Sequence, residues 1–234
     1  MWNNFISHFA TVELSQEEED EFRWKLDRSG VFSVKSHFLG LINQNTPNSN
    51  KVIWKIKTPL RIKIFFWYLR RGVVLTKDNL AKRNWHGNQR CCFCHENKMI
   101  QHLFFDCRFT RLVWATIYAA WGLPQPRDVS SMFGNWTIGV PKKYKQLVRV
   151  GAAALCWSVW RCRNSVIFVN KQPSFLQVIY STTHWLRTWA ILQPSTSQDV
   201  LVAASHFLEQ VAKEFFARAH GWRSKTLSDF VRLL

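Results

Sequence analysis

The feature that most constrains this chain is a group of cysteine and histidine residues between positions 91 and 107. Cys91 and Cys94 are separated by two residues, a spacing that lets a tight turn present two thiolates to one metal ion. His102 and Cys107 can return a second pair of ligands from a helical turn and its exit. Three thiolates and one imidazole suit a closed tetrahedral Zn2+ site that leaves no position for a catalytic water. The pattern therefore predicts one structural zinc ion, whose binding free energy contributes to folding.

Two other interpretations of these residues stay open at this point. Cys92 or His95 could replace one of the four ligands, although Cys92 and Cys94 are closer together than the first pair of a zinc knuckle usually is. The group could instead consist of buried thiols and a core histidine, since free cysteine is often buried. Cys156 and Cys162 lie in a helical segment without an evident partner, and we expect ordinary core or surface thiols there. The chain begins without a signal-peptide pattern, which favours metal binding over disulfides.

The amino-terminal region is predicted to contain a β-hairpin. Residues 1–21 end in an acidic run and are expected to form a solvated lead-in. Polar and apolar side chains alternate over residues 22–34, with turn-forming residues at 27–30, which is typical of a hairpin. Residues 36–42 predict a short helix, and the polar run at 43–50 predicts a loop.

The rest of the chain is expected to be helical. Thr58 as an N-cap and Pro59 at the first helical position predict a helix that ends near Gly72. Thr76 is a plausible N-cap for a short helix over residues 77–83. Periodic apolar residues predict further helices at 110–121, 145–168, 175–192 and 199–219. The predicted fold class is thus mainly α within the α+β class: a helical domain with one N-terminal hairpin and a Cys3His zinc knuckle, followed by a helical C-terminal region.

Four segments are expected along the chain. Residues 124–136 are rich in Pro, Ser, Arg and Gly, which favours a linker. The predicted boundaries are an acidic lead-in at 1–21, a zinc-binding domain at 22–122, a linker at 123–144 and a helical region at 145–234.

The charge is strongly one-sided, with 32 Lys and Arg against 15 Asp and Glu and a formal net charge of +17. Such a chain attracts polyanions, nucleic acid first and an anionic membrane surface second, unless the charge only keeps it soluble. Residues 51–90 hold eleven basic side chains and one acid, Asp78, while residues 129–198 hold eight basic side chains and no acid. The longest apolar run, at 150–160, is too short to span a bilayer. We expect an intracellular protein that is not secreted and has no membrane partner; residues 142–145 form a weak nuclear-import-like cluster.

No assembled catalytic set is evident, so we expect that the chain is not an enzyme. It lacks a P-loop, a nucleophile elbow and a His-Glu-x-x-His motif. Two-metal phosphoryl chemistry needs clustered carboxylates, and the acids after Glu21 are scattered. Asp106 lies between two predicted ligands and is interpreted as a group that supports the metal site or caps a helix.

Several separated motifs occur in an order that resembles the plant reverse-transcriptase zinc-binding domain. They are Trp24-x8-Ser33-Val-Lys-Ser36, Ile53-Trp-Lys-x3-Pro59, Lys63-Ile-Phe-Phe-Trp67, Leu75-Thr-Lys-Asp-Asn-Leu80, Cys91-x2-Cys94 and His102-Leu-Phe-Phe-Asp-Cys107. The resemblance covers about residues 22–118, and the later segment around 155–164 is similar to the segment that comes after this domain in related plant sequences. In that family the domain follows the polymerase of LINE-type (non-LTR) retrotransposons. The resemblance implies a role in holding template RNA or target DNA near the polymerase, and a chain that is a remnant of such an element.

The leading hypothesis is a non-catalytic module that binds the backbone of RNA or DNA and takes no small-molecule substrate. Phe66 and Trp67 lie in an apolar run and are expected in the core, whereas Trp85 is the better candidate for stacking on bases. The alternative is a structural module that packs against a polymerase, such as a reverse transcriptase domain, without nucleic-acid affinity of its own. A residual nuclease is a weaker third idea. The predicted nucleic-acid contacts are Lys55, Lys57, Arg61, Lys63, Arg70, Arg71, Lys82, Arg83, Trp85 and Arg90.

Overall fold

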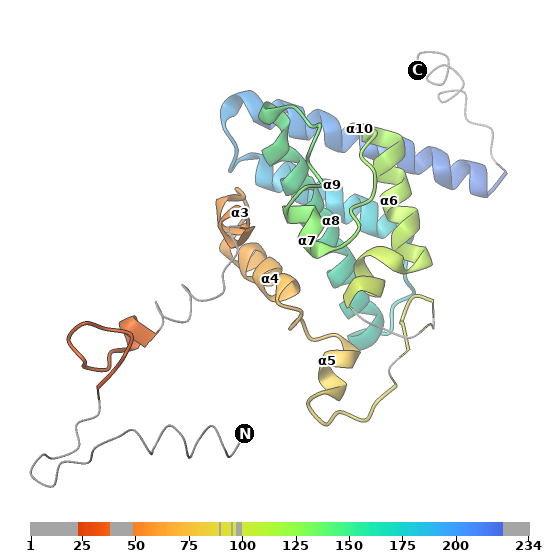
Figure 1. Cartoon of the computed structure of the whole chain (residues 1–234). Coiled ribbons are helices and arrows are strands. Elements are labelled where there is room, and N and C mark those ends of the chain that lie inside the picture. The colour runs from red at the N-terminus through yellow and green to blue at the C-terminus, as the bar shows by residue number, and fades with distance from the viewer. Residues whose placement is uncertain (1–22, 38–48, 89, 95, 97–99, 222–234) are drawn as a thin grey trace, which may run out of the picture. The chain divides into compact units, whose positions relative to one another are not determined.

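The computed structural model describes residues 23–37, 49–88, 90–94, 96 and 100–221. The chain divides into two compact units, residues 1–47 and residues 48–234. The described parts are helical and contain no strand, so the mainly α fold class is confirmed (Figure 1). The predicted lead-in and most of the predicted helix and loop between residues 36 and 50 lie outside the described residues.

The predicted β-hairpin is wrong. The Trp24 amide donates to the Gly30 carbonyl (2.7 Å) and closes a turn, but residues 31–33 do not pair with the segment before it. Ser33 instead caps a helical turn at 34–37, since its hydroxyl accepts a hydrogen bond from the Ser36 amide (3.0 Å). The Trp24 indole donates to the hydroxyl of Ser36 (2.9 Å). Side-chain hydrogen bonds therefore fold this segment into a compact turn, whereas an isolated two-stranded hairpin is only marginally stable.

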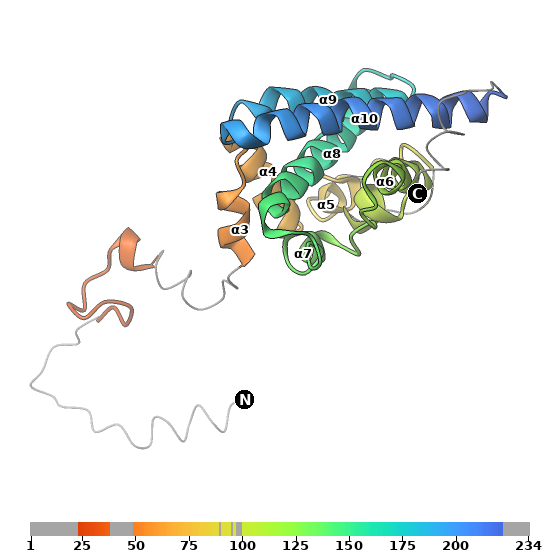
Figure 2. The ribbon, with the colours of Figure 1, turned by 90° about the horizontal axis from the view of Figure 1, so that it is seen from above.

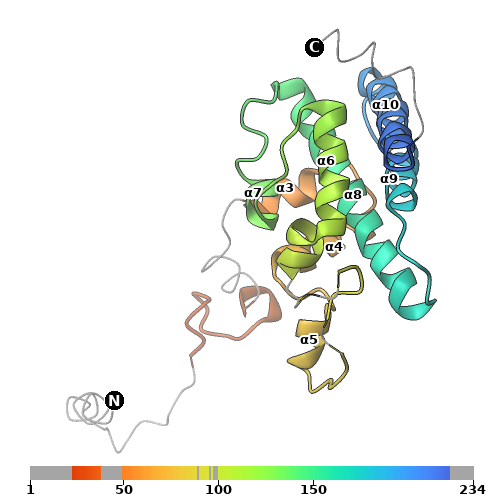
Figure 3. The same cartoon turned by 90° about the vertical axis from the view of Figure 1, so that its right-hand side faces the viewer.

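The larger unit is a helical assembly. Its elements are α3 (Ser49–Lys55), α4 (Leu60–Arg70), α5 (Lys77–Ala81), the π-helical turn η1 (His102–Asp106), α6 (Arg108–Trp121), α7 (Val129–Phe133), α8 (Lys142–Phe168), α9 (Phe175–Ala190) and α10 (Ser195–Ala219). Of these, α6, α8, α9 and α10 begin and end within a few residues of the predicted helices, whereas α3 and α7 were not predicted as helices. In Figure 2, α9 and α10 run side by side in one layer, and α8 packs beneath α9. Figure 3 shows α6 in front of α8, and α6 also contacts α10.

The middle of α8 forms the centre of this unit. Residues 150–156 are all buried, which is the pattern of a helix covered on every side rather than on one face. Phe65 of α4 packs edge-on against Trp157 of α8, with ring centroids 5.2 Å apart. Val178 and Leu186 of α9 add to the same apolar core. The helices after residue 142 and the region around α4 therefore share one core.

Two helix starts differ in detail from the prediction. Pro59, with ψ 149°, stands at the N-cap of α4, one residue later than predicted, because Thr58 instead makes a backbone turn with Ile56. Thr76 is the N-cap of α5 as predicted, but its hydroxyl donates to the Val74 carbonyl and caps no helical amide. The helix after it ends at residue 81.

The segment expected as a linker, residues 123–144, contains α7. Asp128 begins this helix with a capping box, in which its carboxylate accepts from the Ser131 amide (2.6 Å). The helix buries Val129, Met132 and Phe133 in the core that α4 and α8 share. This segment is thus packed into the larger unit.

Three polar side chains connect the C-terminal helices to the region before the cysteines. The buried guanidinium of Arg163 donates to the Leu75 carbonyl (3.1 Å). Gln146 donates to the carbonyl of Lys55 (3.0 Å), and Gln193 donates to that of Lys57 (2.7 Å). These bonds add polar contacts between the two regions, of which the Gln146–Lys55 bond is exposed and the other two are partly buried. No helix within the described ranges is long and apolar enough to cross a membrane.

Candidate metal centre and basic surface

The π-helical turn η1 aligns the second pair of predicted ligands. The Cys107 amide donates to the His102 carbonyl at 2.7 Å, a bond across five residues. In an α-helix, side chains five residues apart differ by about 140° in direction, since each residue turns about 100°. The wider π turn brings Cys107 back toward the side of the helix on which His102 lies. The x4 spacing between them is therefore suited to this local structure.

The interior of this turn is anchored in the core. Leu103, Phe104 and Phe105, which lie between the two ligands, are all at most 1% exposed. Their carbonyls accept hydrogen bonds from side chains instead of from helical amides: Thr110 donates to residue 103 (2.8 Å), Trp114 to residue 104 (2.9 Å), and Gln125 to residue 105 (2.7 Å). Each buried carbonyl of the π turn thus has a partner.

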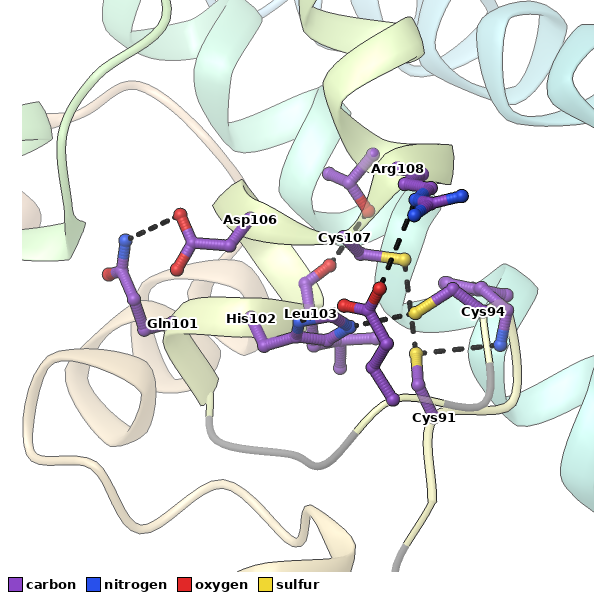
Figure 4. A network of polar contacts seen from close by, with 11 residues as sticks. Cys91, Cys94, Gln101, His102, Leu103, Asp106, Cys107 and Arg108 are labelled. Carbon is purple, nitrogen blue, oxygen red and sulfur yellow. Dashed lines mark hydrogen bonds and ion pairs between the residues drawn. The ribbon is translucent and has the colours of Figure 1, made fainter.

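The four predicted ligands come together in the structure. The ligand atoms of Cys91, Cys94, His102 and Cys107 all lie within 4.8 Å of one another. Figure 4 shows the four side chains pointing toward a common centre, from the turn after residue 90 and from both ends of η1. The Sγ atoms of Cys91 and Cys107 are 3.9 Å apart, and Cys94 Sγ lies 3.0 Å from His102 Nε2.

The thiols interact strongly in this arrangement. The hydrogen bond between the sulfurs of Cys107 and Cys91 lowers the pKa of Cys91 and raises that of Cys107. The Phe93 amide also donates to the Cys91 sulfur (3.5 Å). Burial raises the pKa of the Cys94 thiol. Thiols gathered in this way lose their protons when a cation takes the centre.

This donor set fits a zinc ion. In a tetrahedral site with Zn–S bonds of about 2.3 Å, neighbouring sulfurs are about 3.8 Å apart. The Sγ atoms of Cys91 and Cys107 are 3.9 Å apart, close to this separation, so these two sulfurs are already spaced to bind one zinc ion. Cys107 is fully buried, whereas Cys94 and His102 are half-buried. The four residues could hold one metal ion beside the core.

Residues 32–114 match the sequence family described as zinc-binding in reverse transcriptase. Over this segment the chain is similar to the reverse-transcriptase zinc-binding domain. The predicted resemblance and the predicted zinc cofactor are both confirmed by this match together with the Cys3His cluster.

One curated relative extends the similarity beyond the zinc-binding domain. A protein of Arabidopsis thaliana, provisionally named a ribonuclease H protein, is 25% identical over 176 residues. The aligned region covers 66% of this chain but only 27% of the relative, so the chain spans about a quarter of that protein's length. No solved structure matches the chain.

The neighbours of His102 are charged residues that the sequence did not single out as part of the site. His102 Nδ1 lies 3.9 Å from the Glu96 carboxylate, which is also 3.9 Å from Arg108 Nε. Asp106, which was predicted to support the site or cap a helix, instead accepts a hydrogen bond from Gln101 (3.4 Å). Glu96 is therefore the carboxylate beside the imidazole of the zinc-binding domain. Glu96 lies five residues after Cys91, and this spacing matches no pattern from which a carboxylate beside His102 could have been predicted.

The remaining thiols lie outside the cluster. Cys92 neighbours Cys91 in sequence, but it is not among the four converging residues, and His95 lies outside the described residues. Cys156 and Cys162 are buried in the core, as expected, and burial raises the pKa of both thiols.

The predicted nucleic-acid contacts lie in α3 and α4 and in the segments that follow α3, α4 and α5. Seven of the basic residues are exposed, and Lys63 and Arg70 are half-buried. None of Lys55, Lys57, Arg61, Lys63 and Arg71 forms an ion pair within the described residues, where carboxylates pair only with Arg108, Arg187 and His102. The exposed residues are Lys55, Lys57, Arg61, Arg71, Lys82, Arg83 and Arg90.

The aromatic residues near this surface differ in their exposure. Phe66 is buried, as predicted, but Trp67 is only half-buried and carries the Arg71 guanidinium 4.4 Å above its ring. Trp85, the predicted stacking residue, is 38% exposed. Its ring lies over Gly87, where a Cβ atom would be only 2.0 Å from the indole. One face of Trp85 is thus already covered by backbone.

A cavity of about 550 Å³ lies elsewhere in the larger unit, and none of its lining residues belongs to the metal cluster. It is lined mainly by apolar side chains from the end of α6, residues 122–141 and the starts of α8 and α10, with Trp121, Trp136 and Tyr144 among them. The cavity contains no group of ionisable side chains suited to catalysis.

Proposed function

We propose that this chain is a non-catalytic, zinc-binding module that binds the backbone of RNA or DNA, and that it derives from the reverse transcriptase of a LINE-type retrotransposon. In this proposal the zinc ion is structural. It holds the turn after residue 90 against η1, and it thereby fixes the position of the segment that links α5 to the core. An intracellular and nuclear location is part of the same proposal.

The observation that carries the proposal is the row of cations without carboxylate partners on α3 and α4. Residues 51–77 contain no acid at all. Lys57, Arg61 and Arg71 are exposed there without an ion pair. Unpaired like charges repel one another, and phosphates of a nucleic acid would relieve this repulsion while releasing counterions. Contacts of this kind give affinity with little choice of sequence.

The test measures the salt dependence of binding. The zinc-loaded chain is titrated into fluorescein-labelled RNA and DNA at several salt concentrations, and anisotropy gives Kd. The logarithm of affinity should fall linearly with the logarithm of salt concentration, and Lys57→Gln or Arg71→Gln should each reduce the slope by about one. Lys213→Gln, an exposed lysine on α10, is the matched control and should leave the slope unchanged. Absence of binding at low salt by a folded, zinc-loaded chain contradicts the proposal.

A second candidate function is a structural module that packs against a polymerase without binding nucleic acid itself. It is favoured by exposed apolar side chains on α4: Leu60 is 65% exposed, Tyr68 45% and Ile64 37%. Exposed apolar groups of this kind often mark a protein contact. The titration separates the two candidates, because only the first predicts salt-dependent affinity for nucleic acid.

A further inference from the structure

The outward side of α4 combines apolar and cationic side chains in one stripe. At about 100° per residue, its exposed residues and the half-buried Trp67 fall within an arc of about 120°, and the half-buried Lys63 and Arg70 lie beside this arc. The opposite side of the helix is buried in the core through Ile62, Phe65, Phe66 and Leu69. The stripe, which we call the α4 stripe, consists of Leu60, Arg61, Ile64, Trp67, Tyr68 and Arg71.

The apolar part of the α4 stripe is unusual for a solvent-facing helix surface, which is normally polar. Leu60, Ile64 and Tyr68 lie on consecutive turns and are all exposed. The Tyr68 and Trp67 rings are adjacent, with centroids 5.1 Å apart. Trp54, on the neighbouring helix α3, is 44% exposed as well. The surface thus offers flat aromatic faces to a ligand.

The cationic part of the stripe extends onto α8. The Arg61 guanidinium lies over the Trp185 ring at 5.7 Å, and that of Arg161 lies over the same ring at 5.5 Å. Neither guanidinium pairs with a carboxylate in the described part of the chain. Both cations therefore lie beside one indole without a carboxylate partner, and the phosphates of a ligand would offset their charge.

A ligand that satisfies both halves of the stripe must carry phosphates and exposed flat apolar groups together. Duplex DNA and RNA present phosphates, but their bases are stacked inside the helix and would leave Tyr68 and Ile64 unused. A single strand exposes its base faces beside its phosphates, and aromatic side chains bind such faces with little sequence preference.

We propose that the α4 stripe binds single-stranded nucleic acid, with Tyr68 as a stacking platform and Arg61, Arg71 and Arg161 as phosphate contacts. This inference rests on the proposed nucleic-acid binding and deepens it by naming the strand class. It also assigns the stacking role to Tyr68 rather than to Trp85.

The experiment compares strand classes in the zinc-loaded full chain. Anisotropy gives Kd for a labelled single-stranded 20-mer and for a hairpin duplex of the same composition at one salt concentration. Tyr68→Ala should weaken single-strand binding about fivefold or more and change duplex binding little. Tyr68→Phe should restore the affinity, since the ring and not the hydroxyl makes the contact. Tyr118→Ala is the matched control, because this tyrosine is 60% exposed on α6, outside the stripe.

The outcomes distinguish this inference from the proposed function. Tighter binding of the single strand, lost selectively in Tyr68→Ala and retained in Tyr118→Ala, supports it; Leu60→Ser provides a second variant at an exposed stripe position. Equal affinity for both strand classes with no effect of Tyr68→Ala overturns the inference but leaves backbone binding intact. Absence of nucleic-acid binding, whether or not the chain binds phosphatidylserine vesicles, overturns both.

Discussion

At the residue scale, the arrangement around His102 gives each ring nitrogen a separate role. Nε2 faces the cysteine sulfurs, while Nδ1 faces the Glu96 carboxylate at 3.9 Å. A carboxylate in this position orients a metal-bound imidazole and strengthens it as a ligand. Arg108 Nε lies 3.9 Å from the other oxygen of Glu96, in an exposed ion pair that contributes little by itself. Their spacing in the sequence singled out the four residues that converge here, but a supporting carboxylate has no fixed spacing and could not be identified in this way.

We expect Glu96→Gln to weaken zinc affinity without preventing zinc binding. The expected loss is about tenfold, at the low end for such supporting carboxylates, because Glu96 is half-exposed and its attraction to the ring is screened. Competition with a chromogenic chelator measures the affinity. Asp106→Asn is the control, since Asp106 contacts Gln101 and should leave the affinity unchanged. Equal losses in both variants would show that Glu96 has no special role.

At the element scale, the contact between α9 and α10 includes one partly buried ion pair beside its apolar core. Arg187 NH1 lies 2.7 Å from Glu209 Oε1, and Thr183 donates to the same oxygen. Burial alone would raise the pKa of Glu209, but the hydrogen bonds from Thr183 and Arg187, with the nearby charge of His206, bring it below its ordinary value. The ionised carboxylate is therefore favoured in the folded state.

The sign of this shift predicts a loss of stability in acid. Because the folded-state pKa of Glu209 is lowered, its contribution is present above the unfolded-state pKa, about 4.3, and is lost as pH falls through the folded-state value. Urea unfolding at pH 7 and at pH 4 measures the free energy of unfolding. The difference between the chain and Glu209→Gln should be about 1–2 kcal/mol at pH 7, allowing for the exposure of Arg187, and smaller at pH 4. A difference that does not change with pH contradicts this account. Any zinc released in acid destabilises the chain and the variant alike, so it does not affect the difference between them.

The element scale also shows what could be predicted from sequence. Helices α6, α8, α9 and α10 were expected within a few residues, because amphipathic or long apolar periods identify them directly. The hairpin prediction was wrong because alternation over residues 22–34 is equally compatible with a turn that side-chain hydrogen bonds close. Ser33 and Ser36 take part in these hydrogen bonds. The π turn could not be anticipated, because it depends on donors from Thr110, Trp114 and Gln125, which lie outside the turn, 7, 10 and 20 residues beyond the carbonyls that they bind.

At the scale of the whole molecule, the zinc-binding domain depends on the helices that follow it. The family match ends at residue 114, but Phe65 packs against Trp157, and Arg163 donates to the Leu75 carbonyl. These contacts join residues about ninety positions apart, as the Arg163–Leu75 bond shows with a separation of 88. Sequence patterns define each helix but not which helices share a core, so this dependence was not predicted.

We therefore expect a fragment of residues 23–122 to lose cooperative folding even with zinc bound. Removal of α8 to α10 exposes the buried sides of α4 and α6, and each large apolar side chain returned to water costs about 1.5–3 kcal/mol. Thermal unfolding followed by circular dichroism should show a sharp transition for the full chain and none for the fragment. A fragment that unfolds as sharply as the full chain would show that the domain folds by itself.

The central claim is that Cys91, Cys94, His102 and Cys107 bind one structural zinc ion. Metal analysis of the purified chain by mass spectrometry tests it most directly, with Cys94→Ser and His102→Ala as ligand variants and Cys92→Ser as the matched cysteine control. The account predicts about one zinc per chain in the wild type and in Cys92→Ser, and loss of both zinc and helical signal in the two ligand variants. A folded wild-type chain without zinc, or ligand variants that retain it, would contradict the account.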